Sequence, residues 1–181
     1  FSFIWWRKSG KNGWVTEKIF RNYLEIKPHD DFKTVDKPSD NYNVELIDKK
    51  DFQLNKFFYK NIGKNYEWVD RLIWTDLNWM DYISNEKLST YILRDKEELV
   101  GYFEVLFNSN TKETEIAYLG ILEEYFGKKL GGYLLSEAIK VSFSKGSLRI
   151  WAHTCSLDHN NALGNYLSRG MKIFKSETLI R

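Results

Sequence analysis

Residues 114–144 read TEIAYLGILEEYFGKKLGGYLLSEAIKVSFS, and this stretch decides the fold. Its first nine residues are rich in branched and aromatic side chains, which is typical of a β-strand. After a loop, apolar residues recur at four-residue spacing, which predicts a helix with one buried face that ends at Gly146. The residues expected on that face are Leu130, Leu134, Leu135, Ala138 and Ile139.

The loop between this strand and this helix carries Gly127, Gly131 and Gly132 around Lys128 and Lys129. Glycines let the backbone turn tightly into a helix N-terminus, where free N–H groups and the positive dipole end favour a phosphate or pyrophosphate. The loop is not a Walker loop, because no G-K-[ST] follows, and G-x-G-x-x-G is absent. A turn without a ligand is the plainer interpretation.

The flanking sequence predicts further elements. We expect strands at 44–47, 89–93 and 100–107, helices at 51–61 and 75–83 capped by Asp51 and Thr75, a strand at 148–154, a helix at 158–170 and a strand at 171–174. The three strands between 89 and 122 are joined by polar turns and should form an antiparallel meander. The predicted fold is therefore α/β, with a mixed, mainly antiparallel central sheet flanked by helices.

Residues 1–43 differ from the rest, because they hold both prolines and a polar stretch rich in turn formers. We interpret them as an N-terminal arm and linker, and residues 44–181 as the domain.

Composition excludes several classes of protein. The 181 residues suit one domain with one core, and the single cysteine, Cys155, excludes a disulfide framework. No metal-ligand spacing occurs. The formal charge of +2 argues against a nucleic-acid or membrane partner, and the absence of a long apolar run or a secretory leader indicates a cytoplasmic protein.

Three segments, TEIAYLGIL, FGKKLGGYLL and ALGNYLSRGM, resemble motifs of the GNAT superfamily of acyl-CoA-dependent N-acyltransferases, and the similarity extends over residues 44–175. The longer segments EIAYLGILEEYFGKKLGGYLL and WAHTCSLDHNNALGNYLSRG are similar to an uncharacterised bacterial branch. The resemblance implies acetyl-CoA, or another short acyl-CoA, as the acyl donor. The loop amides would hold its pyrophosphate, and the strand before the loop its pantetheine arm. The implied cofactor-binding residues are Leu119, Gly120, Ile121, Leu122, Gly127, Lys128, Lys129, Leu130, Gly131 and Gly132.

The resemblance also implies two catalytic residues. Glu115 falls where some members place a general base, and Tyr166 matches the tyrosine that protonates the departing thiolate. Backbone N–H groups near Leu122 would stabilise the oxyanion. The plainer interpretations are a solvated strand glutamate, paired with a neighbouring lysine, and a core tyrosine.

Three further candidates for a functional role are Asp158, His153 and Cys155. Asp158 has the side chain of a helix N-cap. His153 and Cys155 share one face of a strand, which raises a Cys/His nucleophile pair, but no orienting acid accompanies them.

The loop departs from the family pattern. Phe126 replaces the usual first residue, and Lys129 stands where the first glycine is expected. Lys129 must therefore adopt a backbone conformation that glycine usually takes, or the loop is reshaped. His159 replaces an asparagine, and Met171 a phenylalanine.

The segment YEWVDRLIW, residues 66–74, lies where family members build the acceptor side of the cleft. Trp68 and Trp74 are candidate walls around an amine, with Asp70 or Glu67 attracting its charge. Ordinary aromatic packing, with Asp70 and Arg71 as a surface ion pair, is the alternative.

The sequence thus predicts an N-acetyltransferase in which a primary amine, on a small molecule or a peptide, attacks the acyl-CoA directly. A module of the same fold that binds CoA and regulates, with little catalysis, is the second hypothesis. Pairing of the last strands allows a homodimer but does not require one.

Overall fold

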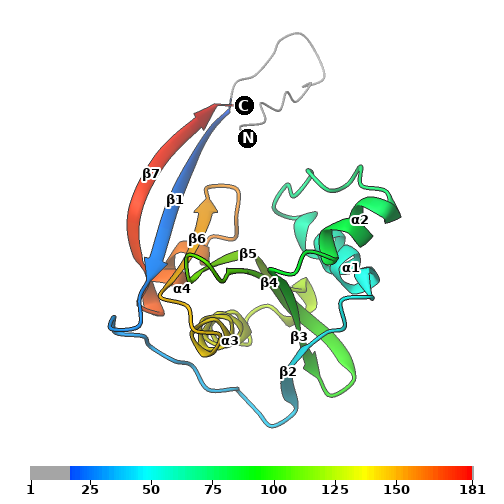
Figure 1. The fold of residues 1–181 in the computed structure, drawn as a ribbon, viewed down its shortest axis with the longest axis horizontal. Helices are drawn as coiled ribbons and strands as arrows, with labels where there is room; N and C mark the ends of the chain where they lie inside the picture. The colour runs from blue at the N-terminus through cyan, green and yellow to red at the C-terminus, as the bar shows by residue number, and fades with distance from the viewer. Residues whose placement is uncertain (1–16, 181) are drawn as a thin grey trace.

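The computed structural model describes residues 17–180. Within them, seven strands form one sheet in the order β2-β3-β4-β5-β6-β1-β7, and only β5 and β6 run parallel to each other (Figure 1). The strands are β1 (Lys18–Ile26), β2 (Tyr42–Leu46), β3 (Leu88–Asp95), β4 (Glu98–Asn108), β5 (Glu113–Ile121), β6 (Arg149–Cys155) and β7 (Lys172–Ile180). The helices are α1 (Phe52–Gly63), α2 (Asp76–Ile83), α3 (Leu130–Ser144) and α4 (Ala162–Ser168), with a 3-10 turn, η1, at Glu123–Tyr125. The predicted α/β class, with a mainly antiparallel sheet, is confirmed.

Helices cover both faces of the sheet because strand residues alternate between the faces. Phe103 faces α3 and belongs to the larger core cluster, whereas its neighbour Tyr102 packs against Phe58 and Ile62 of α1. The five apolar residues predicted for the buried face of α3 are all buried. The central strands of the sheet therefore lie between two packed layers, one formed with α3 and one formed with α1.

Both predicted N-caps of the early helices are confirmed. Asp51 accepts a hydrogen bond from the backbone N–H of Gln53, and Thr75 forms a capping box with Asn78. On α2, Trp79 is buried as expected, but Met80 is 51% exposed.

Strand β1 is the element that the sequence analysis missed, because it lies within the residues interpreted as an arm and linker. It inserts between β6 and β7 and pairs antiparallel with both (Figure 1). Its partners lie more than 120 residues away along the chain, so no local pattern identifies them. Residues 1–16, the first part of the predicted arm, lie outside the described residues.

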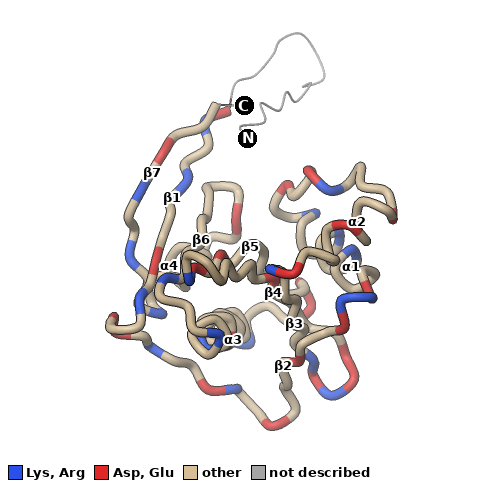
Figure 2. The backbone as a smooth tube through the Cα atoms, viewed as in Figure 1, with Lys and Arg blue, Asp and Glu red and all other residues tan. Residues whose placement is uncertain are grey.

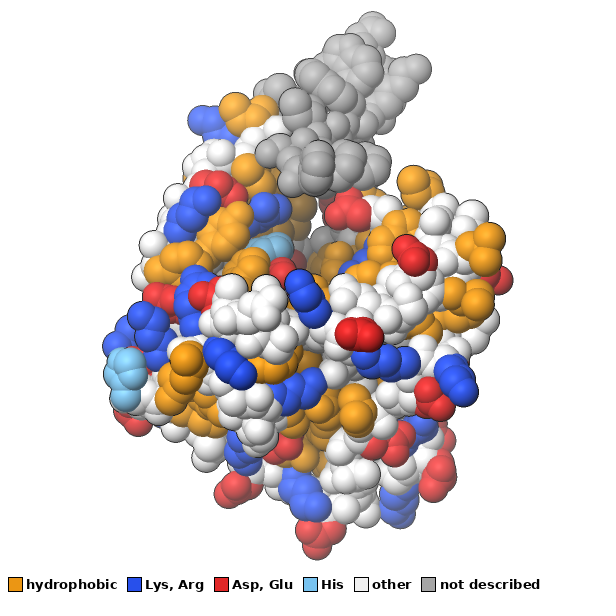
Figure 3. Space-filling view, in the orientation of Figure 1, with side chains coloured by type: hydrophobic (Ala, Val, Ile, Leu, Met, Phe, Trp, Pro, Cys, Tyr) orange, Lys and Arg blue, Asp and Glu red, His pale blue; other side chains and the backbone are white. Residues whose placement is uncertain are grey.

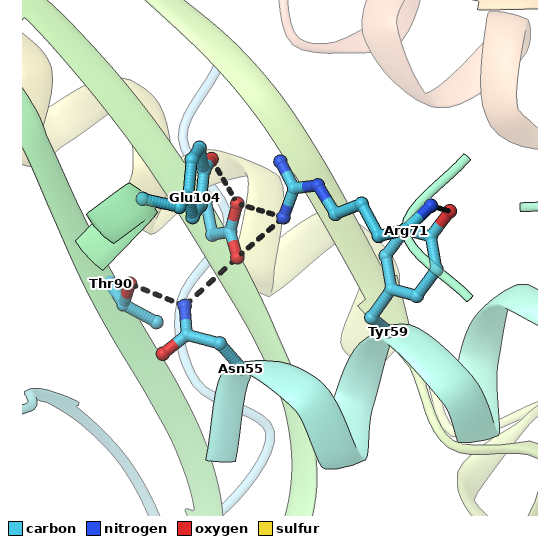
Figure 4. Close-up of polar contacts among 6 residues, drawn as sticks. Asn55, Tyr59, Arg71, Thr90 and Glu104 are labelled. Carbon is cyan, nitrogen blue, oxygen red and sulfur yellow. Dashed lines mark hydrogen bonds and ion pairs between the residues drawn. The ribbon is translucent and has the colours of Figure 1, made fainter. Parts of the chain in front are cut away.

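A buried ion pair joins the sheet to the layer of α1 and α2 (Figure 4). Glu104 of β4 is fully buried and accepts hydrogen bonds from Asn55 (2.9 Å), Arg71 (3.2 Å) and the hydroxyl of Tyr82 (2.6 Å). The alternative of a surface pair between Asp70 and Arg71 is therefore wrong, since Arg71 is only 7% exposed and pairs with Glu104.

Outside this pair, acidic and basic residues are both spread over the described chain, and Figure 2 shows no large region of a single charge. None of the helices in residues 17–180 is long and apolar enough to cross a membrane.

Replacing Glu104 by glutamine should lower the free energy of unfolding by about 3–5 kcal/mol, because Arg71 would remain buried without its counter-charge. Urea unfolding followed by fluorescence measures this loss. Glu45→Gln is the matched control: its partner Arg94 lies nearer the surface, so the expected loss is below about 1 kcal/mol. Similar losses in the two variants would contradict a special role for the buried pair.

Candidate functional site

One large cleft, of about 1130 Å³, opens beside the parallel strand pair. Its walls come from β5, β6, the curved pair β1 and β7, the segment 66–71, and the loops that precede α3 and α4. Figure 3 shows its mouth as a hollow between the two halves of this face.

Strands β5 and β6 separate within the cleft. Their pairing runs only from Glu113 and Arg149 to Glu115 and Trp151, although β5 continues to Ile121. A register shift against β4 leaves Ala117 without a partner, which marks a bulge at the start of the gap. The two strands are therefore separate near Leu119, in the strand expected to hold the pantetheine arm.

The gap exposes backbone groups of β5. Successive peptide groups of a strand point to opposite edges, and the carbonyl of Gly120 faces Gly101 of β4. The backbone groups of Leu119 and Ile121 consequently point toward the gap. The N–H of Leu122 already donates to Val100 (2.8 Å), and Leu122 does not line the cleft, so this N–H is not a free oxyanion donor.

The glycine-bearing loop enters α3 at the end of the gap. Gly127 has φ 78°, and Lys129, the N-cap residue, is left-handed with φ 61° and ψ 21°. The expectation that Lys129 takes a glycine-like conformation is therefore confirmed. Its side chain makes no capping hydrogen bond, so the first N–H groups of α3 stay available. This loop fits a diphosphate.

The residues predicted to bind the cofactor divide into those that line the cleft and those that do not. The cleft is lined by Leu119, Gly120, Ile121, Gly127, Lys129, Leu130, Gly131 and Gly132. Lys128 does not line it: its ammonium lies 5.0 Å from the ring centre of Tyr125.

Glu115 lines the cleft from β5 and is half-buried. Its carboxylate makes no hydrogen bond or ion pair within residues 17–180. The alternative interpretation of Glu115, a solvated strand residue paired with a neighbouring lysine, is therefore wrong. Burial raises the pKa of Glu115 above its ordinary value. A carboxylate of this kind is suited to accepting a proton near neutral pH.

Tyr166 lines the cleft from α4 and also packs against the main core. Burial and, secondarily, the charge of Asp158 raise the pKa of its hydroxyl. Its proton is therefore held at any ordinary pH, as an acid catalyst requires. Asp158 itself is not the N-cap of α4, which is Asn161; it accepts hydrogen bonds from Thr154 and from the N–H of Cys155 and closes the turn after β6.

The acceptor residues proposed from the sequence are only partly together. Trp68 and Asp70 line the cleft, and the Trp68 ring stands 4.9 Å from that of Tyr118. Trp74 lies outside the lining: it packs on the guanidinium of Arg71 (4.8 Å) and on Trp79 (4.9 Å). The cation beside Trp74 is thus the protein's own arginine.

One wall of the cleft was not foreseen, because it depends on β1. Arg21 and Tyr23 of β1 lie beside Glu177 of β7, whose carboxylate accepts a hydrogen bond from the Tyr23 hydroxyl (2.6 Å). His153 of β6 stands next to them, with its ring 5.7 Å from that of Tyr23. The only local signal for this strand was the content of branched and aromatic residues in KIFRNYLEI, residues 18–26.

The Cys/His pair gains no support from the geometry. Burial raises the pKa of the Cys155 thiol and lowers that of His153, so each group is held neutral. Within residues 17–180, no three His, Cys, Asp or Glu side chains are close enough to hold a metal ion.

Comparison with known families gives one match: the model of the acetyltransferase (GNAT) family matches residues 51–171. No curated protein matches the sequence.

Solved structures show the same fold. A GCN5-related N-acetyltransferase from Sphaerobacter thermophilus is similar over 90% of this chain and 50% of its own length, with TM-score 0.67 and 14% identity. An aminoglycoside acetyltransferase from an uncultured soil sample is similar over 74% and 90%, with TM-score 0.61 and 14% identity. An IAA acetyltransferase from Bacillus cereus is similar over 74% and 79%, with TM-score 0.55 and 20% identity. The chain spans only 50% and 58% of the Sphaerobacter protein and of a GCN5-related N-acetyltransferase from Kribbella flavida.

Lys129→Gly should raise the free energy of unfolding by roughly 0.5–1 kcal/mol, because glycine adopts the left-handed conformation without steric cost. Lys140→Gly, within right-handed α3, is the matched control and should lower it by about 1 kcal/mol. Urea unfolding of both variants tests the difference. An equal loss in the two would mean that Lys129 is unstrained.

Proposed function

The chain belongs to the GNAT acetyltransferase family, and on that premise we propose that it transfers an acetyl or other short acyl group from acyl-CoA to a primary amine. The observation that carries the proposal is the arrangement of the cleft. A loop suited to a diphosphate and a strand gap suited to an extended arm open onto the same space, beside Glu115 and Tyr166.

Acyl-CoA supplies a thioester whose carbonyl carbon an amine can attack. The residues of the loop and the first turn of α3 hold its diphosphate through backbone N–H groups, so the identity of their side chains matters little. The backbone of Leu119 and Ile121 holds the pantetheine arm in the gap. Their N–H groups, in place of that of Leu122, are the donors available to the thioester oxygen.

Two side chains move the protons. Glu115, directly or through a water molecule, removes the proton of the ammonium and so frees the lone pair for attack. Tyr166 gives its proton to the sulfur as the carbon–sulfur bond breaks, and its phenolate takes up the second proton of the attacking nitrogen as the amide forms. The acyl group passes directly to the nitrogen, and no residue of the chain needs to become acylated.

The acceptor amine lies between the aromatic surface of Trp68 and Tyr118 and the carboxylate of Asp70. Asp70 has no ion-pair partner among the described residues, so a cationic acceptor would balance its charge. Trp74 is a supporting residue, because it contacts Arg71 and not the cleft.

A CoA-binding regulatory module is the second candidate function. The observation that favours it is the left-handed Lys129, which takes the place of a glycine at the diphosphate loop.

Calorimetric titration with acetyl-CoA, followed by a screen of amines for release of CoA thiol, separates the two candidates. Binding in the micromolar range with thiol release supports the acyltransferase. Binding without release for any amine supports the regulatory module. Absence of binding by both the wild-type protein and Lys129→Gly at about millimolar concentration would refute both.

Glu115→Gln should lower kcat about 100-fold or more and remove the acid limb of the kcat–pH profile. Because the pKa of Glu115 is raised, that limb should lie above the ordinary range of carboxyl groups: activity is lost as the pH falls and the base takes up a proton. Glu124→Gln, on the exposed turn η1, is the control and should keep both rate and profile. An unchanged limb in Glu115→Gln would exclude it as the base.

Tyr166→Phe should lower kcat by a similar factor and leave binding of acetyl-CoA nearly unchanged, because it removes only the proton donor. The raised pKa of Tyr166 predicts no alkaline limb from this group at ordinary pH. Steady-state kinetics together with calorimetry measure both effects. Full turnover in this variant would show that the thiolate leaves without the tyrosine.

A further inference from the structure

Helix α4 lies against the first turn of α3 through two residues one turn apart. The side-chain amide of Asn165 donates to the carbonyl of Gly131 (3.0 Å). Four residues later, the guanidinium of Arg169 lies against Gly132: a Cβ atom added at Gly132 would fall 2.6 Å from its Nη1. The glycine pair that opens α3 therefore allows the close approach of an arginine that no sequence motif singled out.

The backbone around Arg169 is firmly held. Its carbonyl accepts a hydrogen bond from the N–H of Lys33 (3.0 Å), in the connection between β1 and β2. The same connection is tied to α3, since the N–H of Val35 donates to the hydroxyl of Ser136 (3.0 Å). The backbone of Arg169 is thus held beside α3.

That charge has no partner. Within residues 17–180, the guanidinium of Arg169 makes no hydrogen bond or ion pair, and its Nε atom is buried and unsatisfied. The positive end of the α3 dipole lies next to it, which disfavours a cation at this place unless an anion binds. Lys128 and Lys129 also lack ion pairs in the described chain, so positive charge accumulates around the loop.

We propose that Arg169 donates hydrogen bonds to a phosphate group of the bound acyl-CoA and thereby sets the affinity for the donor. The proposal rests on the proposed function, since acyl-CoA is the ligand. The planar guanidinium matches phosphate oxygens in pairs, and an anion would satisfy the buried Nε that has no partner. Arg169 stands outside the cleft lining, next to Gly132, where a phosphate at the cleft's end would meet it.

Calorimetry with three ligands tests the proposal: acetyl-CoA, its analogue without the 3′-phosphate, and acetyl-pantetheine, which has no phosphate. Arg169→Gln should weaken acetyl-CoA binding about 10-fold or more and leave acetyl-pantetheine binding unchanged. If the loss disappears with the analogue, Arg169 contacts the 3′-phosphate; if it persists, Arg169 contacts the diphosphate. Arg169→Lys should restore part of the affinity, because it keeps the charge but not the planar fork.

The control is Arg94→Gln, which removes an arginine that is paired with Glu45 and does not line the cleft, and it should bind all three ligands as the wild-type protein does. Equal acetyl-CoA affinity in wild type and Arg169→Gln, or an equal loss with acetyl-pantetheine, would overturn the proposal. If the wild-type protein itself binds no acetyl-CoA, the proposed function fails as well, so the two failures are distinguishable.

Discussion

The carboxylate of Glu104 is the constraint on which the layer of α1 and α2 depends. It lies in the middle of β4 with no exposure, and its donors come from α1, from the segment between α1 and α2, and from α2. A buried carboxylate must be satisfied, because leaving it unpaired costs several kcal/mol. These donors therefore hold both helices and the intervening segment at one position over the sheet. Tyr82 and Tyr118 enclose Arg71, with ring centres 4.1 and 4.2 Å from the guanidinium carbon. The wall that carries Trp68 and Asp70 is thus rigid.

The other half of the cleft depends on the point at which the pairing between β5 and β6 ends. Strands β5 and β6 pair over three residues and then separate, so peptide groups of β5 that a neighbour would normally satisfy face open space. Beyond that gap the chain turns through two positive-φ residues into α3, whose first N–H groups are also unsatisfied. In the acyl transfer proposed above, recognition of the donor is therefore mainly a property of the backbone. Arg169 is proposed to add to it from outside the cleft.

Local signals predicted the elements that are stabilised locally. Asp51 and Thr75 cap helices because their side chains reach N–H groups two or three residues away. The left-handed Lys129 was expected instead from the resemblance, because it stands where the family loop has a glycine. Asp158 shows the limit of such reasoning: an N-cap and a residue that closes a strand turn have the same side chain, and only the position of the helix start distinguishes them. The predictions for Trp74 and Arg71 were wrong for a related reason. Asp70 and Arg71 are adjacent and resemble a surface ion pair, but the fold brings Glu104, 33 positions away, to Arg71, and Trp74 packs on that arginine.

By itself the sequence determined the α/β class, the order of elements from β2 onward and the glycine-bearing turn into α3, because each depends on the period, caps and glycines of a short segment. Glu115 and Tyr166 were predicted as proton carriers only because their segments resemble motifs of the GNAT superfamily. The tertiary structure alone decided the place of β1, the wall formed by Arg21, Tyr23 and Glu177, the occupant of the aromatic cluster around Arg71, and the position of Arg169 beside Gly132. These features join residues that are distant in the chain, such as Arg71 and Glu104, 33 positions apart, and Tyr23 and Glu177, 154 positions apart. Burial and charge satisfaction select such pairs only when the whole chain is folded, and no local pattern records them.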